Sequence, residues 1–256
     1  MNSGFRTKCR KMYILGKIGG FPDDYISDIH FKELVLEYNK KVYLRDKIRG
    51  FKNGLISQSI KMDKTIDYYE NNADSFAAGT VEVDFADVQD RFLSYLPDAG
   101  TVLDFGCGSG RDTKYFIEKG YTVDATDGSE KLCKIAGKYT GIDVRHMLFS
   151  ELDADMKYDG IWACSSILHL PKDELKTVIA KMIRAVRPGG YIYSSFKYGE
   201  FEGFRNNRYF TDFTSESFHI LVKDFPEITI IEEWISSDVR PGRSEEKWLN
   251  LIMQKK

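Results

Sequence analysis

The sequence lacks any apolar run close to the ~20 residues that a helix needs to cross a bilayer. Its basic N-terminus has an apolar core of only Met12 to Leu15, which is shorter than the ~7–15 residues typical of the core of a signal peptide. These two absences predict a cytoplasmic protein that has no membrane segment.

Cysteine is also scarce. The four cysteines, Cys9, Cys107, Cys133 and Cys164, include no C-x-x-C pair. The sequence therefore shows neither zinc-ligand spacing nor a disulfide framework, and we predict no metal site. We expect Cys107 and Cys164 to be small packing residues rather than nucleophiles.

Charge is nearly balanced but unevenly distributed. Residues 1–65 hold 14 Lys and Arg against 7 Asp and Glu, whereas residues 66–256 hold 23 against 32. Such a basic segment either binds an acidic partner or docks on the acidic remainder of its own chain. We predict a basic, partly helical extension at residues 1–64, and a second domain at residues 65–256.

Glycine is concentrated in one stretch, VLDFGCGSGRDT, at residues 102–113. An apolar strand ends in Asp104, and Gly106, Gly108 and Gly110 follow at alternate positions before a segment with helical apolar spacing. Glycine at such a strand–loop–helix turn permits positive φ and lets a ligand approach the backbone. The loop also presents the free N–H groups of the helix to that ligand.

The glycine spacing excludes the dinucleotide fingerprint G-x-G-x-x-G. Its third glycine would fall at Arg111 or at Thr113. Residues 104–110 read D-x-G-x-G-x-G instead, which resembles motif I of the class I S-adenosylmethionine (SAM) dependent methyltransferases. An acid beside glycine amides suits the ammonium and carboxylate at the amino-acid end of SAM.

A second acid, Asp127, follows Gly106 by 21 residues at the end of the next predicted strand. An acid about 20 residues after such a loop is placed to accept hydrogen bonds from both ribose hydroxyls. The alternative is that Asp127 caps a helix that begins near Ser129, and the two roles are compatible.

Two further stretches carry the resemblance: the Y-D-G strand within residues 158–170 and the R-P-G-G turn at residues 187–190. The sequence is most similar to small methyltransferases of the tellurite-resistance type. The resemblance implies a Rossmann-like α/β fold with seven strands in the order 3-2-1-4-5-7-6. Strand 7 would be antiparallel, and the apolar stretches at residues 228–236 and 247–254 would supply the last two strands.

The stretch at residues 65–76 matches the family pattern Y-x-x-x-A-x-x-F through Tyr69, Ala73 and Phe76. In the family, a helix with this pattern covers the cofactor. The alternative is that the aromatic residues here belong to the core.

The resemblance also implies a set of site residues at the strand ends and in the following loops. The expected cofactor-binding residues are Tyr69, Asp104, Gly106, Gly108, Gly110, Asp127, Gly128, Ser150, Glu151 and Cys164. The expected acceptor-binding residues are Tyr68, Lys197, Arg205 and Arg208. His169 is the candidate general base where the acceptor must lose a proton, and its alternative role is to stabilise its own loop.

We therefore predict an enzyme that moves a methyl group from SAM to a small molecule or metalloid by in-line transfer, leaving S-adenosylhomocysteine (SAH). One alternative is a nucleic-acid methyltransferase guided by the basic N-terminus. Against it, residues 164–167 read CSSI and not an N-P-P-Y type tetrapeptide. The other alternative is a non-catalytic SAM-binding module.

Overall fold

The computed structural model describes residues 64–240 and 242–256. The predicted basic extension lies outside these residues, apart from Lys64. The domain boundary at residues 64 and 65 therefore stays a prediction.

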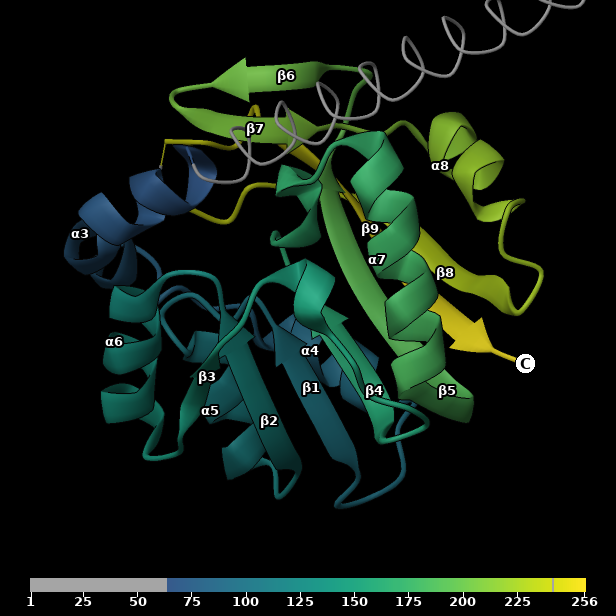
Figure 1. Ribbon diagram of the computed structural model, residues 1–256, viewed down its shortest axis with the longest axis horizontal. Coiled ribbons are helices and arrows are strands. Elements are labelled where there is room, and N and C mark those ends of the chain that lie inside the picture. The colour runs from purple at the N-terminus through teal and green to yellow at the C-terminus, as the bar shows by residue number, and fades with distance from the viewer. Residues whose placement is uncertain (1–63, 241) are drawn as a thin grey trace, which may run out of the picture. The chain divides into compact units, whose positions relative to one another are not determined.

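A seven-stranded sheet forms the centre of the structure, in the order β3-β2-β1-β4-β5-β9-β8 (Figure 1). β9 pairs antiparallel with both neighbours, and the pairs among the first five strands are parallel. The predicted order and the antiparallel seventh strand are confirmed, since β8 and β9 are the sixth and seventh strands of this sheet. The strands are β1 (Thr101–Phe105), β2 (Thr122–Asp127), β3 (Val144–His146), β4 (Tyr158–Ala163), β5 (Val186–Lys197), β8 (Ile228–Ser237) and β9 (Lys247–Lys255).

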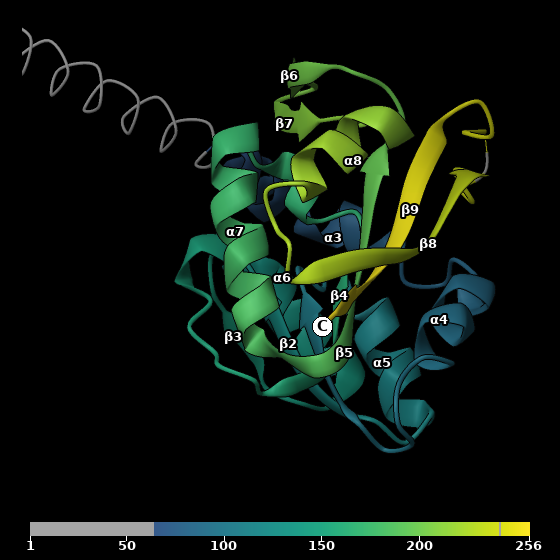
Figure 2. The same ribbon diagram turned by 90° about the vertical axis from the view of Figure 1, so that its right-hand side faces the viewer.

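Helices cover both faces of this sheet (Figure 2). In that view α4 and α5 lie on one side and α7 on the other. A helical segment at residues 64–71 comes before α3. The described helices are α3 (Ala73–Ala78), α4 (Ala86–Leu93), α5 (Arg111–Glu118), α6 (Glu130–Thr140), α7 (Lys172–Ala185) and α8 (Ser215–Val222), with short 3-10 turns η1 (Phe149–Glu151) and η2 (Ile167–His169).

Successive side chains of a strand point to opposite faces of the sheet. Because helices cover both faces, the side chains of the central strands are buried on both sides. Leu103 and Ile161 belong to the larger apolar cluster, which includes the buried face of α7. Their neighbours Val102 and Trp162 belong to a second cluster, on the side of α4 and α5. The near-continuous apolar runs of β1 and β4 follow from this two-sided burial.

The segment at residues 200–212 contains a β-hairpin. β6 (Glu202–Arg205) and β7 (Arg208–Thr211) pair antiparallel. Asn206 and Asn207 form the turn, with φ of 49° and 63°. Two left-handed residues give the turn that matches the twist of a two-residue hairpin, and asparagine tolerates this conformation.

The R-P-G-G segment was predicted to be a turn before the fifth strand, and this prediction was wrong in its boundary. β5 already begins at Val186, which pairs with Tyr158. The register then shifts between Tyr158 and Gly160, and Gly189 takes a φ of 77°. The glycines therefore serve an irregularity within the strand.

Within the part of the chain that the structure describes, no helix combines the length and apolar character needed for a membrane span.

Gly160 allows α4 to pack closely on β4. A Cβ added at this position would lie 2.8 Å from both Leu96 Cδ1 and Phe92 Cζ. We predict that Gly160→Ala lowers the free energy of unfolding by about 1–3 kcal/mol through overpacking, measured by urea denaturation. Leu96→Ala should lower the free energy of unfolding by less in the Gly160→Ala background than in the wild type, because the smaller side chain makes room for the added Cβ. Additive costs would contradict this prediction.

Candidate functional site

A cavity of about 890 Å³ lies at the carboxyl ends of β1, β2 and β4, where open α/β sheets bind ligands. This volume falls within the range of small-molecule sites. Ten of the predicted site residues line it: Tyr69, Gly106, Gly108, Asp127, Gly128, Cys164, His169, Lys197, Arg205 and Arg208. The other predicted residues do not line it: Tyr68, Asp104, Gly110, Ser150 and Glu151.

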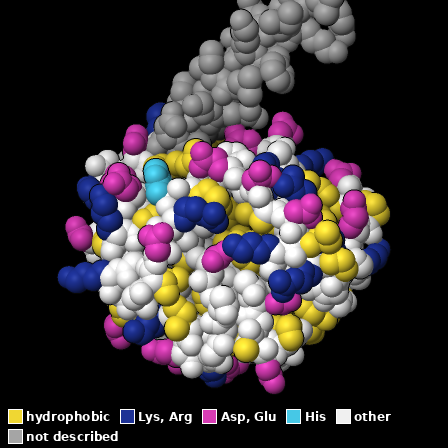
Figure 3. All heavy atoms as spheres, turned by 60° about the horizontal axis from the view of Figure 1, so that its bottom comes forward, with side chains coloured by type: hydrophobic (Ala, Val, Ile, Leu, Met, Phe, Trp, Pro, Cys, Tyr) yellow, Lys and Arg dark blue, Asp and Glu magenta, His cyan; other side chains and the backbone are white. Residues whose placement is uncertain are grey.

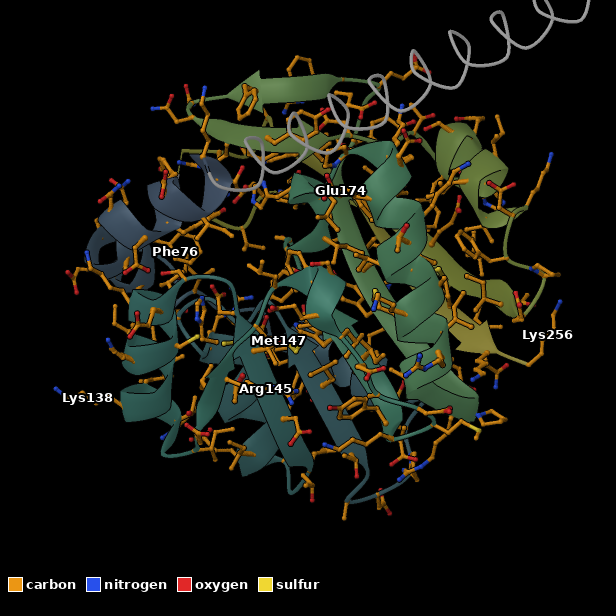
Figure 4. The ribbon with its side chains drawn as sticks, in the orientation of Figure 1. Phe76, Lys138, Arg145, Met147, Glu174 and Lys256 are labelled. Carbon is orange, nitrogen blue, oxygen red and sulfur yellow. The ribbon has the colours of Figure 1, made fainter. Side chains whose placement is uncertain are left out.

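The glycine loop comes into close contact with its neighbours. Gly106, Gly108 and Gly110 have φ of 90°, 56° and 82°, which L side chains rarely adopt. A Cβ on Gly106 would lie 2.5 Å from Ser166 Cβ, and one on Gly108 would lie 3.0 Å from the Phe76 ring. Phe76 comes from α3 (Figure 4), so the predicted covering helix does pack against the loop.

Gly110 acts in packing and stands away from the cavity. It forms the N-cap of α5, and its Cβ would lie 2.9 Å from Thr140 Cγ2 and 3.0 Å from Ala136 Cβ of α6. The absent side chain lets α5 and α6 approach each other beside the loop.

Asp104 lies beneath the loop. It is 2% exposed and accepts a hydrogen bond from Thr113 Oγ1 at 2.5 Å. Burial raises the pKa of the Asp104 carboxyl, and the neighbouring Asp112 carboxylate raises it further. The structure thus gives Asp104 a partner within the protein, and its predicted contact with a ligand stays a prediction.

A buried carboxylate that the sequence analysis did not identify, Asp112, holds α5 against the core. It accepts hydrogen bonds from Gln89 Nε2 at 2.7 Å, Trp162 Nε1 at 2.8 Å and Arg111 Nε at 2.7 Å. This fixes the Arg111 side chain, which lines the cavity over the Phe85 ring at 4.7 Å. The only signal for Arg111 was its place directly after the glycine loop.

Asp127 connects the end of β2 to the glycine loop. Its two oxygens accept hydrogen bonds from the Gly108 N–H at 2.9 Å and the Ser129 N–H at 2.8 Å. Ser129 itself is the N-cap of α6, so Asp127 supports the cap and also faces the cavity. Desolvation raises the pKa of Asp127, while the two backbone hydrogen bonds oppose this shift.

The turn η1 contributes to the cavity a different residue from the two that the resemblance implied for cofactor binding. Ser150 and Glu151 of η1 are exposed, and Glu151 Oε2 accepts a hydrogen bond from the Leu148 N–H at 2.7 Å. Phe149 lines the cavity in their place. The apolar character of Phe149 was its only sequence signal.

His169 is held between two partners. Its Nδ1 lies 2.6 Å from the Tyr209 carbonyl oxygen and its Nε2 lies 2.8 Å from Tyr69 Oη. Because a carbonyl only accepts, Nδ1 carries the proton, and Nε2 accepts a hydrogen bond from the Tyr69 hydroxyl. Burial lowers the pKa of His169 to about 4, and the Arg208 cation also lowers it.

The predicted acceptor-binding cations differ in their partners. Lys197 Nζ pairs with Glu246 and, at 3.4 Å, with Asp238. Arg205 pairs with Asp212. The Arg208 guanidinium lies 4.5 Å from the centre of the Tyr68 ring, so Tyr68 supports a cavity residue although it does not line the cavity itself.

Residues 102–190 match the family model described as a methyltransferase domain. Among curated proteins, the chain is 33% identical over 108 residues to the 2-methyl-6-phytyl-1,4-hydroquinone methyltransferase of Synechocystis, covering 39% of this chain and 33% of that protein. It is 33% identical over 99 residues to the methyltransferase GfsG of Streptomyces halstedii, covering 35% of this chain and 34% of that protein. The matches span 33–57% of the length of the curated relatives.

Solved structures share the fold at low identity. The 1,6-didemethyltoxoflavin-N1-methyltransferase of Burkholderia thailandensis, with bound 1,6-didemethyltoxoflavin and SAH, has a TM-score of 0.58 at 22% identity, covering 80% of this chain and 89% of that one. The cyclase SpnF has a TM-score of 0.54 at 16% identity, covering 66% and 80%. Identities this low indicate a common fold, and the cyclase shows that the fold is not limited to methyl transfer.

The environment of His169 predicts a pH dependence of stability. An unfolded histidine titrates near 6.5, whereas folded His169 has a pKa of about 4. The unfolded state therefore binds more protons between these two values, and stability falls as the pH is lowered through this window. We expect His169 to contribute about 2–3 kcal/mol to the loss between pH 7.5 and pH 4.5.

Urea denaturation at these two pH values measures the effect. His169→Gln should lose this part of the pH dependence, whereas His219→Gln, at an exposed position, should keep it. An equal pH dependence in the wild type and His169→Gln would show that His169 charges freely in the folded state.

Proposed function

We propose that this chain, whose residues 102–190 match the class I SAM-dependent methyltransferase family, is an enzyme that transfers the methyl group of SAM to a small-molecule acceptor. SAH would be the second product. The proposal extends from the matched segment to the whole described domain, because the cavity is lined by residues on both sides of that segment.

The observation that carries this proposal is the link between Asp127 and the glycine loop. One Asp127 oxygen accepts the Gly108 N–H at 2.9 Å, and the residue still lines the cavity. A ribose placed there meets an acceptor-only carboxylate beside backbone that is free of side chains. The tight contacts at Gly106 and Gly108 are with Ser166 and Phe76, so these glycines let the loop pack closely where it borders the cavity.

When bound, SAM supplies an electrophilic methyl group on a sulfonium. The protein positions the reactants and limits water, since water around the sulfonium would stabilise the reactant more than the transition state. Phe76 and Phe149 line the cavity and are suited to this exclusion. Arg111 also lines the cavity, in a position fixed by its pairing with Asp112.

His169 does not present a free nitrogen to the cavity, because Tyr69 occupies Nε2. We assign Tyr69 Oη as the group that meets the acceptor, with His169 positioning it. Because burial and the Arg208 cation hold the pKa of His169 near 4, His169 accepts the Tyr69 hydrogen bond and stays neutral. His169 therefore orients the Tyr69 hydroxyl, which is closer to its alternative role than to that of a general base.

Three narrower predictions belong to this proposal: a small-molecule acceptor, the tellurite-resistance type and a cytoplasmic location. A nucleic-acid acceptor gains no support from the face in Figure 3, where Lys and Arg side chains are interspersed with Asp and Glu and neither sign forms a continuous patch.

Asp127→Ala tests the cofactor site. Losing hydrogen bonds to a charged group should weaken SAM binding by about 1.5–3 kcal/mol, which is roughly a 10- to 150-fold rise in Kd. Isothermal titration with SAM and SAH measures the change, and NAD should not bind.

Asp124→Ala is the matched control. Asp124 lies on the same strand but pairs with Lys157 and Tyr158 and does not line the cavity. SAM affinity should stay unchanged in this variant. Unchanged SAM affinity in Asp127→Ala would remove Asp127 from the site, and a wild type that binds neither SAM nor SAH would end the proposed function.

A further inference from the structure

One cation in the cavity wall differs from the rest. Among the described residues, Arg208 is the cavity-lining arginine without a carboxylate oxygen within 4 Å. Within the described part of the chain, its one side-chain hydrogen bond is long, from Arg208 Nη1 to Tyr69 Oη at 3.4 Å, and the buried Arg208 Nε has no hydrogen-bond partner. The half-buried Arg208 guanidinium therefore has N–H donors left for an anion in the cavity.

An anion bound to Arg208 would lie next to Tyr69 Oη, the group that we propose contacts the acceptor. Tyr69 Oη lies between the Arg208 guanidinium and His169 Nε2. The charge of Arg208 also contributes to the low pKa of His169. An anion bound here therefore belongs to the molecule that meets Tyr69.

The neighbouring surface is aromatic. Arg208 Cζ lies 4.5 Å from the centre of the Tyr68 ring and 5.3 Å from that of Phe210. Phe210 packs edge-on against the His169 ring at 4.8 Å and lines the cavity. Arg208 and Phe210 are two positions apart on β7, so both side chains project from the same face of the strand. A flat apolar body beside the anion would pack on this side.

The number of unpaired cations in the cavity indicates whether the bound anion is a carboxylate or a phosphate. The other cavity arginines and Lys197 already have carboxylate partners. A single guanidinium matches a planar monoanion through two parallel N–H groups, whereas a phosphate dianion would leave about one negative charge without a partner. The site therefore suits a carboxylate better than a phosphate ester.

We propose that the methyl acceptor is a planar aromatic carboxylic acid, whose carboxylate binds Arg208 while its ring packs beside Phe210. This inference rests on the proposed methyltransferase function and specifies its substrate class. Arg208 acts here as the residue that selects the acceptor.

Titration of the SAH-loaded protein with 4-hydroxybenzoate, its uncharged methyl ester and phenyl phosphate tests the proposal. We expect 4-hydroxybenzoate to bind at least about tenfold more tightly than either of the other two probes. Equal binding of the ester would overturn the proposal, as would tighter binding of phenyl phosphate or no binding of any probe to a protein that binds SAH.

Substitutions at Arg208 test whether this residue binds the carboxylate. Arg208→Gln should abolish the preference for the acid over the ester. Arg208→Lys should retain part of the preference, because the charge is kept while the planar pair of donors is lost. Arg145→Gln is the matched control: this arginine is exposed on β3, away from the β6–β7 hairpin (Figure 4), and its removal should leave the preference intact.

The SAH affinity of each variant separates this inference from the function on which it rests. Arg208→Gln should keep the wild-type SAH Kd within about twofold, which also shows that the variant is folded. A tenfold loss of SAH affinity would mean that Arg208 holds the carboxylate of the cofactor, and the inference would fail while the methyltransferase function stands. A wild type that binds no SAH would remove both.

Discussion

The structure depends on the close passage of the glycine loop under the loop that leaves β4. A side chain at Gly106 would overlap Ser166, whose Oγ donates a hydrogen bond to the Phe105 carbonyl at 2.7 Å. This contact fixes the ends of β1 and β4 relative to each other. It also sets the start of α5 and the Gly108 N–H that binds Asp127. The backbone of the glycine loop therefore forms one part of the cavity wall, and under the proposed function it would give the nucleoside of SAM a rigid surface without side-chain ordering costs.

Burial of charge is the cost of this arrangement, and the protein offsets it with hydrogen bonds. Asp112 satisfies its two oxygens with donors from three different elements. The Asp104 carboxyl accepts a hydrogen bond from Thr113, and the raised pKa of Asp104 reflects its burial beside Asp112. A carboxyl that is readily protonated is tolerated beneath the loop where a second fixed anion would be expensive.

The sequence predicted what depends on local spacing and missed what depends on tertiary contacts. The glycine loop and Asp127 lie within about 25 residues of each other, and backbone geometry alone constrains them. The Asn206–Asn207 turn was also local, and its hairpin signal was overlooked. In contrast, two partners of Asp112 are Gln89 of α4 and Trp162 of β4, and no motif in the sequence indicates that these side chains meet. Phe149 lines the cavity and Glu151 does not, because of how one short 3-10 turn is rotated. The spacing of residues in the sequence does not specify that rotation.

The side of the cavity that we propose binds the acceptor is built largely from segments outside residues 102–190. The Tyr209 N–H donates to Thr65 Oγ1 at 3.0 Å, Tyr69 contacts His169, and Arg208 packs on Tyr68. The helical segment at residues 64–71 and the β6–β7 hairpin thus depend on each other, although about 140 residues separate them in the chain. Both segments lie outside residues 102–190, the part of the chain that matches the methyltransferase domain model. A fold alone does not specify a reaction, so under the proposed function these two segments are where the acceptor is selected.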